Sequence, residues 1–338
     1  MAGRIITEKP VFRRFTAVLA ACLVVVALLA GCRSNGSKAG AKGNPADNRY
    51  ALPEVPALIS DNQEAIDYIV THYWDKFISE DRPGARDTSL VCGFTKEAFE
   101  EIFYQYALFL RAASPETGLA SGRTILNKVE AFQKENPEST LWSKFTDMYY
   151  HILQDPNSPW RNEEYCIPLL EKRASSSLAT DDEKERAARE LPRFCLNRLG
   201  EKAADFAFTL RNGRVMHLYD IDSEYTILFF SNPGCTNCRE VMESLQSLPG
   251  IDDLIAAKQL AVANVYPDED LGEWIKYSEI YPKNWFNGYD HLLAVNNTPL
   301  YNLRAIPSVY LLDKDKRVIL KDVPTDYLMQ YLSGLFQL

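Results

Sequence analysis

The stretch YTILFFSNPGCTNCREVMESLQSL, residues 225–248, decides the fold of the second half of the chain. Its apolar start, residues 226–230, is rich in β-branched and aromatic side chains, which favours a buried strand. Turn-forming residues 231–234 end that strand. Cys235 and Cys238 follow at Cys-x-x-Cys spacing, and the apolar residues behind them recur at helical intervals. The pattern therefore places both cysteines where a strand passes into a helix.

A cysteine at the start of a helix is predicted to be reactive. The helix N-terminus presents unpaired N–H groups and a partial positive charge. That environment stabilises the thiolate form of a cysteine, which is its nucleophilic form. We therefore expect Cys235 to be a nucleophile and the Cys235–Cys238 pair to carry out redox chemistry.

The first 31 residues have the features of an export signal, with a basic start and an apolar run from Phe15 to Ala30. The run is shorter than the ~20 residues that a spanning helix needs. It ends in Leu29-Ala30-Gly31-Cys32, which resembles the lipobox of bacterial lipoproteins. The resemblance implies that lipid on Cys32 anchors the mature chain to a membrane. A membrane anchor that stays attached is the alternative.

The lipobox implies a location in the cell envelope, with the folded part facing the periplasm. Arg33 follows the lipidated position, so the Asp that retains many lipoproteins in the inner membrane is absent, which favours the outer membrane. The net charge of the chain is −9. No nucleic-acid partner is expected, because phosphate binding needs clustered Lys and Arg.

Composition divides the chain into four segments, which are a signal peptide (1–31), a flexible tether (32–58), an all-helical domain (59–198) and an α/β domain (199–338). Gly, Ser and Ala dominate the tether. Apolar stripes at helical spacing recur through the third segment. In the fourth segment strands alternate with helices, and an antiparallel pair lies near the end.

The α/β segment resembles the thioredoxin fold, and in particular the TlpA/ResA-like branch of exported thioredoxins. The resemblance covers residues 199–338 and includes Ile306-Pro307 directly before a strand. It implies that Cys235 attacks a substrate disulfide and that Cys238 resolves the mixed disulfide. It also implies a cis bond before Pro307 and pairing of the Ile306 backbone with a substrate peptide.

Two positions depart from the family pattern. Gly234 stands where the family has Trp, and Phe229 stands where thioredoxins have a buried acid. The predicted function is a lipid-anchored thiol–disulfide oxidoreductase that acts on protein or peptide thiols and disulfides. It would use an upstream dithiol as electron donor and no cofactor. The departures keep a second hypothesis open, a non-catalytic peptide-binding or assembly lipoprotein.

The sequence leaves other roles open for some of the cysteines. Structural zinc takes four Cys or His ligands, and the sequence has no second cysteine pair or histidine cluster, so no metal is expected. An inert Cys235–Cys238 bond is a further alternative. Cys166 and Cys195 form either a structural disulfide or two separate thiols, and Cys92 is expected to be buried.

The helical domain resembles an uncharacterised family that precedes thioredoxin-like domains in some Gram-negative lipoproteins. The similarity lies in YWDKF, residues 73–77, and DPNSPWRNEEY, residues 155–165. The domain is expected to position substrate over Cys235, to dimerise the protein or to hold the second domain at a distance.

Overall fold

The computed structural model describes residues 50–338, apart from residues 80–81 and 83. The predicted signal peptide, Cys32 and most of the predicted tether lie outside the described residues. Within the part that is described, no helix is long and apolar enough to cross a membrane.

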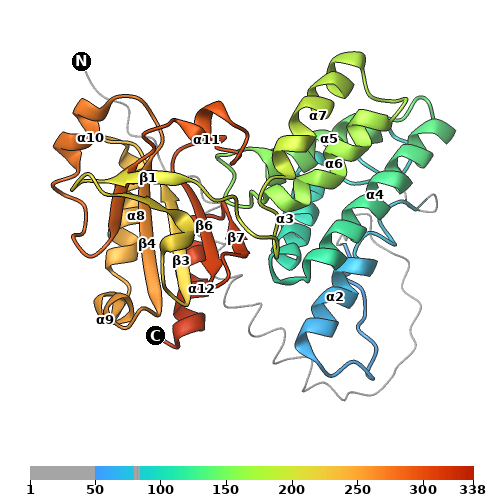
Figure 1. Ribbon diagram of the computed structural model, residues 1–338. Helices are drawn as coiled ribbons and strands as arrows, with labels where there is room; N and C mark the ends of the chain where they lie inside the picture. Colours follow the sequence, from blue (N-terminus) through green and yellow to red (C-terminus); the bar gives the residue numbers. More distant parts are fainter. Residues whose placement is uncertain (1–49, 80–81, 83) are drawn as a thin grey trace, which may run out of the picture.

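The predicted all-helical domain is confirmed. Its elements are α2 (Asn62–His72), α3 (Lys96–Ala112), α4 (Pro115–Glu135), α5 (Leu141–Tyr149), the π-helical turn η1 (Tyr150–Gln154), α6 (Glu163–Ser175) and α7 (Asp181–Phe194). Helix α7 begins with a complete capping box between Thr180 and Glu183. These helices stand together on one side of the molecule (Figure 1).

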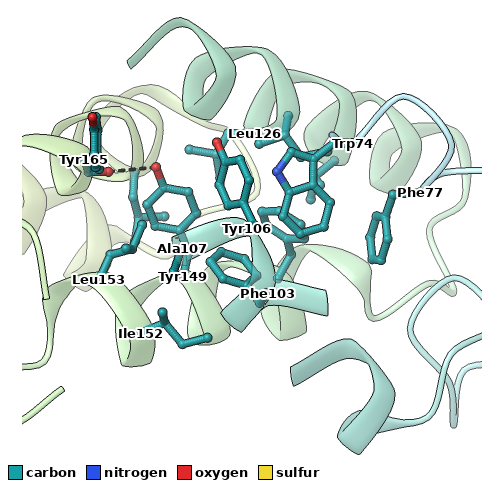
Figure 2. Close-up of a cluster of buried hydrophobic side chains, with 14 of the residues drawn as sticks. Trp74, Phe77, Phe103, Tyr106, Ala107, Leu126, Tyr149, Ile152, Leu153 and Tyr165 are labelled. Atoms are coloured by element: carbon teal, nitrogen blue, oxygen red, sulfur yellow. Dashed lines mark hydrogen bonds between the residues drawn. The ribbon is translucent and has the colours of Figure 1, made fainter. Parts of the chain in front are cut away.

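Aromatic side chains form the centre of the helical domain (Figure 2). Trp74 packs edge-on against Tyr106, with ring centroids 4.9 Å apart. The buried hydroxyls have partners, because Tyr106 donates to Ser121 (2.9 Å) and Tyr149 donates to the carbonyl oxygen of Tyr165 (2.7 Å). These buried hydroxyls are therefore paired within the helical domain.

The second domain is built on a seven-stranded sheet with strand order β2-β1-β5-β4-β3-β6-β7. The strands are β1 (Ala207–Leu210), β2 (Val215–His217), β3 (Tyr225–Phe230), β4 (Leu260–Tyr266), β5 (Phe286–Tyr289), β6 (Ser308–Asp313) and β7 (Val318–Lys321). Strand β3 runs parallel to β4 and antiparallel to β6. The α/β architecture predicted for this half of the chain is confirmed, whereas β5 was not predicted.

Helices cover the sheet and bury its alternating side chains. They are the 3-10 turn η2 (Leu218–Asp220), α8 (Thr236–Gln246), α9 (Ile251–Ala256), α10 (Leu271–Tyr277), α11 (Ala294–Asn297) and α12 (Thr325–Phe336). Ile227 and Phe229 of β3 belong to one core cluster, while Leu228 and Phe230 belong to another. The alternation follows from the two-residue repeat of a strand and fixes which side chains lie under α8.

The two domains lie side by side, and the β6–β7 edge of the sheet is the part nearest the helices (Figure 1). Arg161 donates to the carbonyl oxygen of Val323 (3.4 Å), and the Tyr327 hydroxyl donates to the carbonyl oxygen of Arg111 (3.1 Å). The Arg111 guanidinium also lies 5.4 Å from the centre of the Tyr327 ring. The helical domain therefore contacts the sheet domain directly.

The possible disulfide between Cys166 and Cys195 is not formed, since both cysteines are free. Cys166 is buried in α6, where its thiol donates to the carbonyl oxygens of Leu153 and Asn162, both at 3.1 Å. Cys195 caps the C-terminus of α7 and is exposed. The two thiols thus occupy different environments. Cys92 is buried as expected, and burial raises the pKa of its thiol to about 11.

Candidate redox site

Cys235 occupies the N-cap of α8, at the end of the loop that follows β3. Its sulfur accepts a hydrogen bond from the backbone N–H of Cys238 at 3.1 Å. An N–H group of the first helical turn therefore points at the sulfur, as it would at an anion. The predicted place of the cysteines at the junction of strand and helix is confirmed by this geometry.

Cys235 and Cys238 are joined in a disulfide, with Cα atoms 5.2 Å apart. The two sulfurs are not equally accessible, because Cys235 is half-buried and Cys238 is buried with 5% of its surface exposed. An incoming group therefore reaches Cys235 first.

Gly234 is required by the loop that leads into α8. Its φ angle is +72°, in the left-handed region that favours glycine. A Cβ atom there would lie 3.2 Å from the hydroxyl oxygen of Tyr277. The absence of the family's Trp at this position thus has a structural reason, because a side chain would strain the backbone and crowd Tyr277.

The peptide bond between Ile306 and Pro307 is cis, as the sequence predicts. It lies in the segment before β6, and β6 pairs directly with β3. The carbonyl oxygen of Ile306 is 4.0 Å from the sulfur of Cys235. Residues some 70 positions apart therefore meet at the disulfide.

A cavity of about 90 Å³ opens beside the disulfide. It is lined by residues of the β3–α8 segment and by residues that follow β4, namely Phe229, Ser231, Asn232, Gly234, Cys235, Cys238, Arg239, Met242, Tyr277, Ile280 and Tyr281. Phe229 lies here, where the resemblance expects an acid, and none of these lining residues carries a carboxylate. The sequence alone did not single out Tyr277, Ile280 or Tyr281, because they follow β4 by more than ten residues.

The buried polar groups of the cavity are hydroxyls and amides. Ser231 donates to Asn264 Oδ1 at 2.5 Å, and Asn264 in turn donates to Asn287 at 3.1 Å. Burial raises the pKa of the Tyr281 hydroxyl, and the side chains of Ser231 and Asn264 act in the opposite direction. Tyr281 and Ser231 therefore stay neutral, and they can pass protons only as hydroxyls.

Comparison with known proteins finds matches in both halves of the chain. The family described as "Domain of unknown function (DUF5106)" matches residues 31–194. No curated protein matches the chain.

Among solved structures, the C-terminal domain of an uncharacterized protein from Bacteroides fragilis is 50% identical and covers 40% of this chain and 98% of its own, with a TM-score of 0.39. A thioredoxin-like protein from Bacteroides caccae is 34% identical and covers 84% of this chain and 98% of its own, with a TM-score of 0.68. The similarity to the latter spans both domains. The chain therefore belongs to the family of thioredoxin-like proteins.

Proposed function

We propose that the protein is a thiol–disulfide oxidoreductase of the TlpA/ResA-like type, in which Cys235 is the nucleophile and Cys238 the resolving cysteine. The observation that supports it best is the accessible Cys235 sulfur at a helix N-terminus, 4.0 Å from the carbonyl oxygen before the cis-proline. Cys238 lies buried behind it. Such an arrangement exposes one sulfur for attack and keeps the other within bonding distance.

The reaction is a pair of exchanges between sulfurs. An upstream dithiol first reduces the Cys235–Cys238 disulfide and becomes a disulfide itself. The Cys235 thiolate then attacks a substrate disulfide, and one substrate sulfur leaves as a thiolate that takes up a proton. Cys238 loses its proton and attacks the Cys235 sulfur, so the second substrate sulfur leaves and the disulfide seen here forms again.

The proton of Cys238 leaves through the cavity in this mechanism. A cavity of about 90 Å³ has room for water, since one water needs roughly 10–15 Å³ of such volume. Ser231 and Tyr281 supply hydroxyls that can hold this water. Water and these hydroxyls would thus transfer the proton for which thioredoxins have a buried acid at the position of Phe229.

A peptide is the substrate that suits the surface around the disulfide. Beside Cys235, Ile306 precedes the cis-proline and is only partly buried, so its backbone can pair with an extended chain. On the other side, Ile280 lines the cavity beside the disulfide and is 57% exposed. An extended peptide with apolar side chains near its cysteine would contact both.

Turnover of a peptide disulfide with dithiothreitol as donor tests the function. The purified protein should reduce the peptide, and Cys235→Ser should abolish turnover because the attacking sulfur is lost. Cys195→Ser is the matched control, since it removes an exposed cysteine outside the site. Equal rates for Cys235→Ser and the unmodified protein would refute the assignment.

A non-catalytic peptide binder is the second candidate, and the absence of a carboxylate among the cavity-lining residues favours it. It predicts a stable peptide complex that forms equally well with Cys235→Ser and is never turned over. The same two proteins, measured for binding and for turnover, separate the candidates.

We also propose that lipid on Cys32 anchors the protein in the cell envelope, with its folded part facing the periplasm. Arg33 after the lipidated cysteine favours the outer membrane over the inner membrane. The Leu29-Ala30-Gly31-Cys32 sequence supports the proposal. Mass spectrometry of the mature N-terminus tests it, and an unmodified Cys32 would refute it.

A further inference from the structure

Glu163 is a buried carboxylate of the helical domain whose polar partners belong to the other domain. It is the first residue of α6, and only 1% of its surface is exposed. It accepts hydrogen bonds from Arg304 Nε at 2.6 Å and from Asn302 Nδ2 at 3.0 Å. It also forms an ion pair with Lys321, with Nζ and Oε2 2.9 Å apart. All three partners belong to the α/β domain.

Two of these partners lie in the segment that leads into the cis-proline. Arg304 is two residues before Ile306, and Asn302 is four residues before it. The helical domain holds Arg304 at two further points, because its guanidinium donates to the carbonyl oxygen of Gln154 and lies 4.9 Å from the centre of the Phe194 ring. The segment is thus fixed to the helical domain just before it reaches the disulfide.

Lys321, the third partner, connects Glu163 to β7, the edge strand of the sheet. Lys321 ends β7 and has only 4% of its surface exposed. Its ammonium group also donates to the carbonyl oxygens of Phe194 (3.1 Å) and Leu196 (2.6 Å). Glu163 therefore connects the cis-proline segment, β7 and the end of the helical domain through one buried carboxylate.

This arrangement has a consequence for the position of Ile306. A buried carboxylate is stable only with its charge paired and its oxygens hydrogen-bonded. Residues 302–304 must therefore stay close to Glu163, and this fixes the start of the turn whose Ile306 carbonyl lies 4.0 Å from Cys235. A displaced Ile306 backbone would pair less well with an extended peptide, which would weaken peptide binding.

We propose that Glu163 is a positioning residue, through which the helical domain holds the cis-proline segment in place against Cys235 for peptide binding. The helical domain would then form a working part of the redox site. The activity test of this proposal rests on the proposed oxidoreductase function. Hydrogen exchange tests it independently of that function.

Glu163→Gln tests the proposal, because it removes the charge and keeps the size of the side chain. Glu164→Gln is the matched control. Glu164 is the next residue of α6, is also buried, and pairs with Arg198 rather than with the cis-proline segment. We expect Glu163→Gln to raise KM for a peptide disulfide by about tenfold, with little change in kcat, because about one hydrogen bond of peptide binding is lost. Glu164→Gln should leave both constants within about twofold, since less than about 0.5 kcal/mol of peptide binding depends on it.

The double variant Glu163→Gln/Arg304→Gln should be no worse than the poorer single variant, because both changes break one contact. Hydrogen exchange at residues 305–309 should be faster in Glu163→Gln than in the unmodified protein, and unchanged in Glu164→Gln. Equal effects of the two glutamate variants on KM and on exchange would overturn the proposal. If Glu163→Gln does not fold, Arg304→Gln takes its place with the same expectations.

Failure of the oxidoreductase proposal gives a different result. It would show as no turnover by the unmodified protein, and the exchange rates of residues 305–309 would then decide the role of Glu163 alone.

Discussion

Burial of Asp322 should make the free energy of unfolding depend on pH. It follows β7 directly and has 8% of its surface exposed. Burial raises the pKa of its carboxyl from the ordinary 3.8 to about 6, and the nearby Glu163 acts in the same direction. Arg161 and Arg304 oppose this effect without cancelling it.

The size of the effect follows from the two pKa values. Between pH 3.8 and 6 the folded protein keeps the Asp322 proton that the unfolded chain releases. The free energy of unfolding therefore falls as pH rises through this range, and the stabilising contribution is lost above about pH 6. Each tenfold step in proton affinity is worth about 1.4 kcal/mol, so the total loss is up to about 3 kcal/mol.

Asp322→Asn removes the titration and keeps the shape. The φ angle of residue 322 is +50°, and Asn tolerates this left-handed conformation. We expect the difference in unfolding free energy, variant minus unmodified protein, to rise by up to about 3 kcal/mol between pH 4 and pH 7.5.

Urea unfolding followed by tryptophan fluorescence at several pH values measures this difference. Asp315→Asn, an exposed change in the β6–β7 turn, is the control and should give a flat difference. If the Asp322→Asn difference is also flat from pH 4 to pH 7.5, the burial argument is wrong.

Two further predictions concern a partly buried ion pair and the packing around two glycines. Burial alone would raise the pKa of Glu130, but hydrogen bonds, led by the one from Lys172, outweigh it and lower the pKa to about 2. Glu130→Gln should therefore lower the unfolding free energy by about 1–3 kcal/mol at pH 7. The difference between the variant and the unmodified protein should shrink as pH falls from 4.5 to 2. A difference that stays constant with pH would contradict this prediction. A Cβ at Gly122 would lie 2.7 Å from the Tyr149 hydroxyl oxygen, whereas one at Gly334 would meet nothing within 4 Å. Gly122→Ala should therefore lower the free energy of unfolding by about 1–3 kcal/mol. Gly334→Ala should raise it by up to about 1 kcal/mol. Urea unfolding measures both values, and equal effects of the two variants would contradict the packing described.

Local sequence patterns were sufficient to predict the centre of the second domain. The apolar run of β3, the helical spacing behind Cys238 and the proline before β6 are each encoded within a few neighbouring residues. Strand β5, with the sequence FNGY, was missed because Asn-Gly is typical of a turn. It is a strand because β4 and β1 pair with it on either side.

The contacts of Glu163 could not be predicted for a similar reason. An acidic residue in the first turn of a helix is usually explained by the helix dipole. Its partners Asn302 and Arg304 lie 139 and 141 residues further along the chain. The same holds for the cavity. Phe229 could be placed there from the resemblance, but the position of Tyr281 in the cavity depends on the fold.

Capture of a substrate sulfur by Cys235 tests the central claim most directly. The Cys238→Ser protein, reduced and then mixed with a peptide disulfide, should form a mixed disulfide that cannot be resolved. Intact-mass measurement and peptide mapping should find one added peptide, attached at Cys235. An unmodified Cys235, or a peptide found instead on the exposed Cys195, would contradict the account.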